Sequence, residues 1–174
     1  MMWLVGRRLS RWTGIGFQLV MFPAIHTVMP WALSLAGTRH GWVEGRPGLA
    51  NLAGLILVAA GLYIFLLCTH EHYKAAPAGW LIEKTPHYPT PSYLLTEGPY
   101  RYSCNPIYLA ELVIWLGWMV IYGSLVMVSV FTIGSLLVGP VVVRREERGL
   151  EARFGDVYRE FRRTRPRWFG MARR

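Results

Sequence analysis

The sequence predicts an all-α membrane protein with about four transmembrane helices and an amphipathic helix near its C-terminus. Three observations support this fold class. Of the 174 residues, 53% are hydrophobic and 17% are charged, whereas an ordinary soluble domain has about 25% charged residues. The uncharged residues fall into four long runs. The 19 Lys and Arg residues outnumber the 10 Asp and Glu residues, which gives a formal net charge of +9.

The four uncharged runs have the length of membrane-crossing helices. They are residues 12–36, 49–68, 106–122 and 125–143. The second run holds 20 residues, which at about 1.5 Å per residue spans the roughly 30 Å of bilayer hydrocarbon. Pro23 and Pro30 predict a kink in the first run, because proline removes a backbone donor and clashes one turn back. Glu111 is the one interruption of the third run.

The first run also raises two alternatives. Arg7, Arg8 and Arg11 precede it, as in a signal peptide, but about 25 residues exceed the usual 7–15 of a signal core. We therefore expect a retained helix, so that residues 12–68 hold two N-terminal transmembrane helices. His26 inside this run is either a packed, hydrogen-bonded side chain or a functional residue of the membrane interior.

The positive charges indicate the orientation. When alternate sides of the four runs are compared, 17 of the 19 Lys and Arg residues fall on one side, and 11 of them follow the last run. The positive-inside rule therefore predicts that both termini and the loop 69–105 are cytoplasmic. The basic residues follow the membrane side and no binding motif accompanies them, so we expect no nucleic-acid partner.

Two cytoplasmic segments are the expected place for any chemistry. The loop 69–105 contains five prolines, which argue against a helix across it. In the tail, Leu150, Phe154, Val157 and Phe161 recur at the spacing of one helix face, which is typical of a helix lying on anionic lipid.

Other motifs indicate no further chemistry. Gly14-Ile15-Gly16 lacks the third glycine of a dinucleotide-binding turn. His70-Glu71-His72 resembles a metal site, but residues i and i+2 do not share a helix face. We expect interfacial histidines there and no metal.

The stretch that leads into the third run is the most informative. Asn105 and Pro106 are a natural N-cap and first residue of a helix. This does not account for the tyrosines and the arginine just before them. It also leaves Glu111 inside the membrane in need of a partner, for which Arg101, Arg144 or Arg145 are candidates.

Two motifs in order carry a family resemblance. Gly-Pro-Tyr-Arg-Tyr-x-x-Asn-Pro-Ile-Tyr-Leu is followed by a helical hairpin and by Arg-Glu-Glu-x-x-Leu-x-x-x-Phe-Gly-x-x-Tyr-x-x-Phe. This pattern resembles the isoprenylcysteine carboxyl methyltransferase family, which extends to phospholipid methyltransferases and many bacterial membrane methyltransferases. The match covers residues 92–168 as the family core, and we expect residues 1–174 to form one domain.

The resemblance implies methyl transfer from S-adenosylmethionine to a lipophilic or membrane-proximal carboxylate, thiol or amine. It also implies a multi-pass protein of the bacterial inner membrane that contacts membrane lipids. Arg144 or Arg145 would face the acceptor, and no catalytic residue is assigned. The residues that the resemblance assigns to the cofactor are Tyr93, Leu94, Leu95, Tyr100, Arg101, Asn105, Pro106, Ile107, Tyr108, Glu146 and, as the alternative acid, Glu147.

The sequence departs from the family pattern at three positions. Asn105 replaces the usual histidine, Cys104 replaces the usual arginine or a similar residue, and Ala110 stands where glycine is common. Asparagine can donate and accept hydrogen bonds but takes no proton at neutral pH. Two alternative functions therefore stay open: a sterol-reductase-like membrane reductase, and a non-catalytic protein that binds anionic lipid or a partner.

Overall fold

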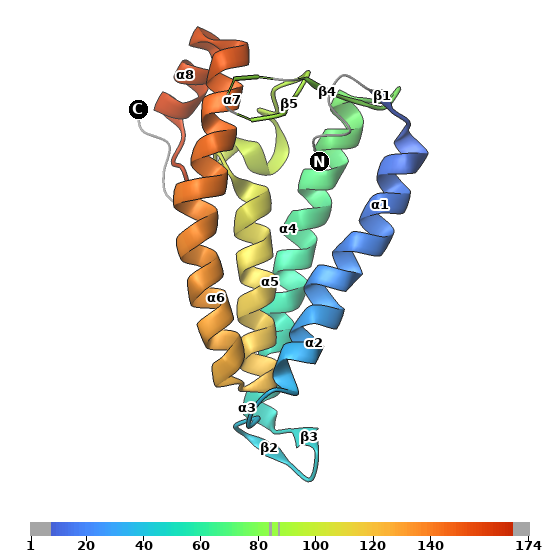
Figure 1. The fold of residues 1–174 in the computed structure, drawn as a ribbon, viewed down its shortest axis with the longest axis vertical. Helices are drawn as coiled ribbons and strands as arrows, with labels where there is room; N and C mark the ends of the chain where they lie inside the picture. Colours follow the sequence, from blue (N-terminus) through green and yellow to red (C-terminus); the bar gives the residue numbers. More distant parts are fainter. Residues whose placement is uncertain (1–7, 84, 87, 169–174) are drawn as a thin grey trace. The chain divides into compact units, whose positions relative to one another are not determined.

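The computed structural model describes residues 8–83, 85–86 and 88–168, and these residues are mostly helical (Figure 1). The helical elements are α1 (Arg11–Pro23), the π-helix η2 (Ala24–Val28), α2 (Met29–Ser34), α3 (Leu49–Leu52), α4 (Gly54–Ala75), the 3₁₀ turn η3 (Gly98–Arg101), α5 (Pro106–Tyr122), α6 (Leu125–Leu137), the π-helix η4 (Val138–Val143), α7 (Arg144–Phe154) and α8 (Asp156–Thr164). The strands are β1 (Arg8–Leu9), β2 (Trp42–Val43), β3 (Arg46–Pro47), β4 (Trp80–Glu83) and β5 (Thr90–Pro91). They form two small antiparallel sheets, β1-β4-β5 and β2-β3.

The long helices confirm a membrane protein of the all-α class. Among the described residues, three helical stretches are long and apolar enough to cross a membrane: Arg11–Ser34, Leu49–Ala75 and Leu125–Phe154. The expected third span is present as α5, an apolar helix of 17 residues. At about 1.5 Å per residue this helix is slightly shorter than the roughly 30 Å of hydrocarbon, so four complete spans stay a prediction.

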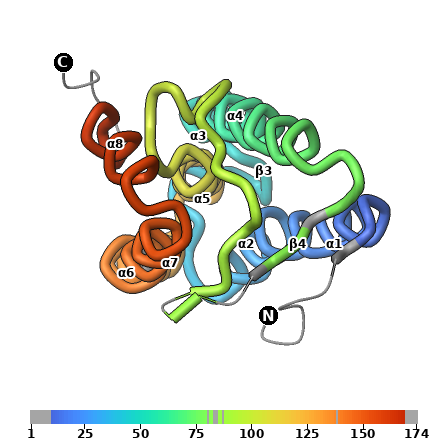
Figure 2. The backbone as a smooth tube through the Cα atoms, turned by 90° about the horizontal axis from the view of Figure 1, so that it is seen from above, coloured from blue at the N-terminus to red at the C-terminus, as the bar shows by residue number. Residues whose placement is uncertain are grey.

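The chain divides into two compact units. One unit is made of Phe17–Phe65 and Ile107–Leu137. Within this unit α5 lies with α4 on one side and α6 on the other (Figures 1 and 2). The second unit holds residues up to Gly16, the stretch Leu66–Pro106 and residues from Val138 onward.

The helical register changes in the first span, at the place where the sequence predicts a kink. After Pro23 the chain winds as the π-helix η2, and the N–H of Met29 donates to the carbonyl of Ala24. The first π-helix directly follows Pro23, and the second, η4, contains Pro140. Both π-helices therefore occur in proline-containing stretches, where the ring interferes with the regular helical hydrogen bonds.

One buried histidine of this unit contacts residues of its other helices. His26 is 5% exposed, packs its ring 4.5 Å from that of Phe22 and places Nε2 3.9 Å from Glu111 Oε1. Its carbonyl accepts a hydrogen bond of 2.5 Å from Trp118 Nε1. His26 is therefore packed, although its Nδ1 has no hydrogen-bond partner among the described residues, and it lies near Glu111, a pairing that the sequence did not suggest.

Helices α4 and α5 approach each other closely because small residues face one another. Gly54 and Gly61 on α4 lie against the backbone of Gly117 and Ala110 on α5, and a Cβ built on Gly54 would lie 2.4 Å from the Gly117 carbonyl oxygen. Ala110 has no exposed surface, so the residue that replaces the family glycine sits in the tight contact. Small residues at such positions allow helix backbones to pack in lipid.

We expect Gly117→Ala to lower the free energy of unfolding by about 1–3 kcal/mol, the usual cost of overpacking. The new Cβ would lie 2.7 Å from the Gly54 carbonyl oxygen and 2.7 Å from the Val58 amide nitrogen, and neither backbone atom can rotate away. Gly134→Ala on α6 is the matched control, since nothing lies within 4 Å of its Cβ position. Thermal unfolding in detergent micelles compares the two; equal melting temperatures would contradict the close α4–α5 contact.

Two boundaries, one at the end of α4 and one in the C-terminal tail, differ from the sequence expectation. Helix α4 continues to Ala75, so the loop begins seven residues later than residue 69. The tail forms two helices instead of one, because Gly155 between them adopts a φ of 53°, a conformation that glycine favours. The break interrupts the predicted apolar face, and Val157 is 67% exposed.

Candidate functional site

The chain just before α5 is hydrogen-bonded to the C-terminal tail. The N–H of Cys104 donates to the Pro166 carbonyl over 2.9 Å, and Ser103 Oγ donates to the Arg167 carbonyl over 3.2 Å. Asn105 Nδ2 also donates to that Arg167 carbonyl, over 3.2 Å. Pro106 begins α5 as expected. The described hydrogen bonds of the Asn105 side chain go to Glu147 and Arg167, so it joins the helix start to the tail.

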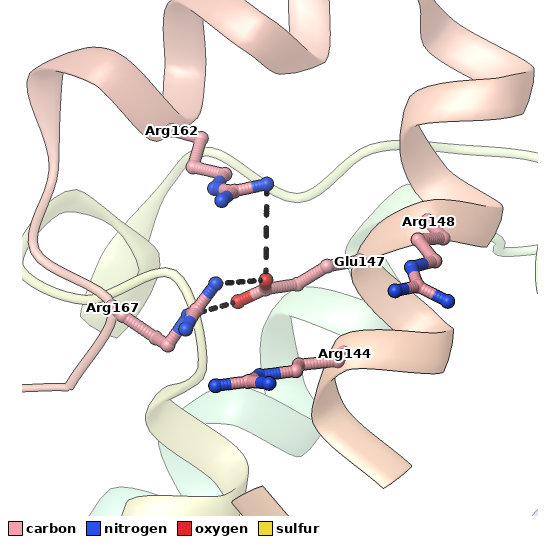
Figure 3. A pocket seen from close by; sticks show the side chains of 5 residues that line it. All are labelled: Arg144, Glu147, Arg148, Arg162 and Arg167. Atoms are coloured by element: carbon pink, nitrogen blue, oxygen red, sulfur yellow. Dashed lines mark hydrogen bonds and ion pairs between the residues drawn. The ribbon is translucent and has the colours of Figure 1, made fainter. Parts of the chain in front are cut away.

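Glu147 is the acid at the centre of this contact. Its side chain is 3% exposed, and the Arg167 guanidinium donates to both oxygens, through Nε to Oε1 at 2.8 Å and through Nη2 to Oε2 at 2.7 Å (Figure 3). Asn105 Nδ2 donates to Oε1 over 3.2 Å, and Arg162 Nη1 lies 3.9 Å from Oε2. A fork-to-fork pair of this kind is both strong and directional. We call Asn105, Glu147 and Arg167 the clamp.

A cavity of about 290 Å³ opens beside the clamp. The residues that line it are Arg144, Glu147, Arg148, Arg162 and Arg167 (Figure 3). Arg144, one of the two residues assigned to the acceptor, therefore lines the cavity, and Arg145 is exposed and outside the lining set. The surroundings also act on Cys104, because burial and the nearby Glu147 charge raise the pKa of its thiol to about 11. This thiol is neutral at physiological pH.

A second cluster gathers around His72 on α4. The hydroxyl of Tyr93 lies 2.9 Å from His72 Nδ1, and the hydroxyl of Tyr100 lies 3.3 Å from His72 Nε2. Both tyrosine rings stand edge-on to the imidazole, with centroids 5.8 and 6.2 Å away. A neutral imidazole has one donor and one acceptor nitrogen, so one tyrosine donates to the ring and the other accepts from it. We call these residues the tyrosine cluster.

Charge connects Glu146 to the tyrosine cluster. Burial raises the pKa of Tyr100 well above its ordinary value, and the negative charges of Glu146 and Glu71 raise it further. Burial raises the pKa of Tyr93 as well. For Tyr88 the cause of the raised pKa is again burial first and the Glu146 charge second. The tyrosine hydroxyls therefore stay protonated at neutral pH.

The two acids of the pair thus have different environments. Successive residues of an α-helix point about 100° apart, since a turn takes about 3.6 residues. Glu147 is held in the clamp by Arg167 and Asn105, while Glu146 is half-buried and its charge acts on Tyr88 and Tyr100. The resemblance assigns Glu146 to the cofactor, with Glu147 as the alternative, and this order stays a prediction.

The remaining residues that the resemblance assigns to the cofactor belong to neither the clamp nor the tyrosine cluster. Leu94 and Leu95 are half-buried between β5 and η3. Arg101 is exposed and pairs with Glu97 on its own turn. Ile107 and Tyr108 are half-buried in the first turn of α5 and belong to the unit that contains Phe17–Phe65. Their assignment to a cofactor stays a prediction.

Two residues of the site were not found from the sequence. His72 was interpreted as an interfacial histidine, and it bridges two tyrosine hydroxyls that follow 21 and 28 residues later. Arg167 was one of many tail arginines, and it pairs with an acid 20 residues earlier. No spacing pattern in the sequence near His72 or Arg167 points to these contacts. Among the described residues, no group of three or more His, Cys, Asp or Glu side chains is placed to hold a metal.

The tyrosine cluster fits the cationic parts of the cofactor that the resemblance implies. Neutral phenol rings attract a sulfonium or ammonium by cation–π contact, worth about 0.5–2 kcal/mol, and the Glu146 carboxylate near Tyr100 suits a positive group or a sugar hydroxyl. Glu147 fits less well, because Arg167 and Asn105 already use its oxygens.

The fold defines a helical membrane protein, and both clusters lie in the unit that contains Leu66–Pro106 and the residues from Val138 onward. The family model for phospholipid methyltransferases matches residues 49–157, more than half of the chain. The chain therefore belongs to the phospholipid methyltransferase family, a family of membrane methyltransferases. Comparison with curated proteins and with solved structures returned no match.

Proposed function

We propose that this protein transfers a methyl group from S-adenosylmethionine to a lipophilic or membrane-proximal acceptor. The observation that carries the proposal is the tyrosine cluster, in which His72 holds the hydroxyls of Tyr93 and Tyr100 and the Glu146 charge acts on Tyr100. Family membership supports methyl transfer over the reductase and over a non-catalytic lipid binder. We further propose that residues 1–174 work as one domain, with residues 92–168 as the family core.

The residues of the cluster contribute binding and orientation. When bound, the cofactor would supply an electrophilic methyl group on sulfur. Tyr93 and Tyr100 present neutral aromatic surfaces to the sulfonium, and His72 holds both rings in place through their hydroxyls. Glu146 accepts from the ammonium or from a sugar hydroxyl. Methyl transfer is a displacement that depends on alignment, and orientation can contribute about 7–11 kcal/mol to lowering a barrier.

Asn105 has a supporting role in this proposal. One asparagine nitrogen carries two N–H groups, and here they serve the Glu147 carboxylate and the Arg167 carbonyl. A neutral histidine carries one N–H and could serve one of the two. The amide thus fits a structural position, so the missing family histidine does not argue against activity in this chain.

The orientation and compartment are part of the same proposal. The excess of Lys and Arg on one side of the apolar runs favours cytoplasmic termini, and the resemblance favours the bacterial inner membrane. The acceptor would then approach from the bilayer.

Calorimetry with S-adenosylmethionine and the purified protein in detergent tests the cofactor. We expect binding by the unchanged protein and a loss of about tenfold or more in affinity for Glu146→Ala, the factor that corresponds to one charge-assisted hydrogen bond. We expect Tyr108→Ala to weaken binding as well. Glu160→Ala is the matched control, because Glu160 is an exposed acid paired with Arg163 on α8. No binding, or binding that neither Glu146→Ala nor Tyr108→Ala weakens, would overturn the proposal.

The acceptor is identified by transfer of label. The protein is incubated with S-adenosylmethionine labelled in the methyl group and with a total lipid extract, and the lipids are then separated. Label is expected in one lipid fraction and not in samples that lack the protein. Label in no fraction, with cofactor binding intact, would contradict a lipid-soluble acceptor.

A further inference from the structure

Glu71 on α4 is an acid beside the tyrosine cluster that no motif assigns to the cofactor. It directly precedes His72, the residue that meets the hydroxyls of Tyr93 and Tyr100. The Glu71 side chain is 13% exposed, and a carboxylate with so little access to water needs a positive partner or hydrogen-bond donors. Glu71 is therefore a second acid, besides Glu146, that could receive a cationic group of a ligand.

The turn that leads into Tyr100 lies against this acid. Gly98 has a φ of 57°, a conformation that glycine favours. A Cβ built on Gly98 would lie 2.9 Å from Glu71 Cγ and 3.2 Å from Glu71 Oε1. The Glu71 carboxylate thus lies against the start of η3, two residues before Tyr100. An acid and an aromatic ring are neighbours here, which suits a ligand whose ammonium and sulfonium are close together.

The partner of Glu71 in the structure is itself a primary ammonium. Lys74 Nζ lies 3.0 Å from Glu71 Oε2 and 3.2 Å from Glu71 Oε1. The Lys74 side chain is 56% exposed, and the two residues are three apart on one helix. Ion pairs of this kind are weak, because water competes for the exposed partner. The carboxylate therefore accepts an ammonium at this position and holds the present one loosely.

We propose that Glu71 receives the ammonium of S-adenosylmethionine and that Lys74 is an internal competitor for the same carboxylate. The two ammonium groups offer the same donors, but the cofactor is also held by the rings of the tyrosine cluster, so it displaces the lysine into water. The inference rests on the proposed function and deepens it, because it assigns the ammonium to Glu71 and leaves a sugar hydroxyl to Glu146.

Calorimetry with the full protein in detergent tests the two roles by the sign of each effect. We expect Glu71→Gln to weaken the binding of S-adenosylmethionine by about tenfold, since one charge-assisted hydrogen bond is lost. We expect Lys74→Met to tighten it by about twofold, since the competing ion pair is removed. If the pair served only to hold the end of α4, the two substitutions would shift the affinity in the same direction or leave it unchanged, and either result would overturn the proposal.

The double variant Glu71→Gln with Lys74→Met shows whether the lysine acts through Glu71. Lys74→Met is expected to have no effect on affinity in the Glu71→Gln background, which is a coupling between the two residues in a double-mutant cycle. An equal gain of affinity in both backgrounds would mean that Lys74 only repels a cationic ligand at long range, and it would overturn the competitor role.

Ligands that lack parts of the cofactor show which group Glu71 meets. S-adenosylhomocysteine keeps the ammonium and lacks the sulfonium charge, whereas methylthioadenosine keeps the sugar and lacks the amino-acid part. We expect Glu71→Gln to weaken S-adenosylhomocysteine by about tenfold and to leave methylthioadenosine within about twofold. Glu160→Gln is the matched control, because Glu160 is an exposed acid paired with Arg163, and it is expected to leave each ligand within about twofold.

The outcomes separate this inference from the proposed function. Equal weakening of methylthioadenosine by Glu71→Gln would overturn the assignment to the ammonium. Binding of S-adenosylmethionine that neither Glu71→Gln nor Lys74→Met alters would overturn this inference alone. If the unchanged protein binds no S-adenosylmethionine, the proposed function is overturned together with it.

Discussion

Arg167→Ala is expected to lower the free energy of unfolding by about 3–5 kcal/mol, the cost of leaving a buried charge without its partner. The Glu147 side chain is 3% exposed, and two hydrogen bonds of 2.8 and 2.7 Å from Arg167 would be lost. Arg167 itself is 35% exposed, so water can partly replace it, which places the expected loss near the lower end. Thermal or denaturant unfolding in detergent micelles measures it.

Two variants show whether this loss belongs to the clamp. Arg163→Ala removes an arginine whose partner Glu160 is 59% exposed, so it is expected to cost at most about 1 kcal/mol. Arg167→Lys keeps the positive charge but not the planar fork, and its stability is expected between those of the unchanged protein and Arg167→Ala. If Arg163→Ala costs as much as Arg167→Ala, then Glu147 is not specially stabilised by Arg167.

The apolar helices could be predicted from the sequence because the free-energy cost of a charged side chain in hydrocarbon decides where they lie. A charged side chain inside the hydrocarbon is expensive, so the uncharged runs mark the helices to within a few residues. The run 106–122 coincides with α5. The run 49–68 underestimates its helix, which continues to Ala75, because a helix does not have to end where its charges begin. Pro23 likewise marked the place where the register changes, but not the π-helix that results.

The tail shows where a periodic pattern is not enough. The apolar spacing across residues 150–161 matched one helix, but Gly155 between the two halves permits a positive φ. Once the chain turns there, Phe161 is 5% exposed and Val157 is 67% exposed. Gly155 is the local signal for the break, and the apolar spacing does not contain it.

The site itself depends on contacts that are distant in the sequence. The clamp joins residue 105 to residues 147 and 167, and the tyrosine cluster joins α4 to the loop that follows it. A motif indicated that Asn105 and the acid pair matter, but the separation of Glu146 from Glu147 follows from which neighbours each one meets. Those neighbours, His72 and Arg167, have no pattern of their own in the sequence.

Asn105→Asp is expected to lower the free energy of unfolding by about 3 kcal/mol, although it changes the shape of the side chain very little. The amide nitrogen lies 3.2 Å from Glu147 Oε1 and 3.2 Å from the Arg167 carbonyl oxygen. Replacing it with oxygen places a third acceptor against these two, which keep only their donors Arg167 Nε and Ser103 Oγ, and an unsatisfied buried group costs about 1–3 kcal/mol. Asn105→Ala removes the same donors but adds no acceptor and no charge, so about 1 kcal/mol is expected.

The exchange of the two groups tests the cause directly. In the double variant Asn105→Asp with Glu147→Gln, the carboxylate and the amide trade places, and a donor again faces an acceptor across the gap. Thermal unfolding is expected to show the double variant more stable than Asn105→Asp alone, which is a favourable coupling energy in a double-mutant cycle. Repulsion between oxygens predicts this rescue, whereas a general loss of packing at Asn105 predicts that the two substitutions simply add. An additive result, or Asn105→Asp no less stable than Asn105→Ala, would show that the amide does not hold Glu147 in the clamp.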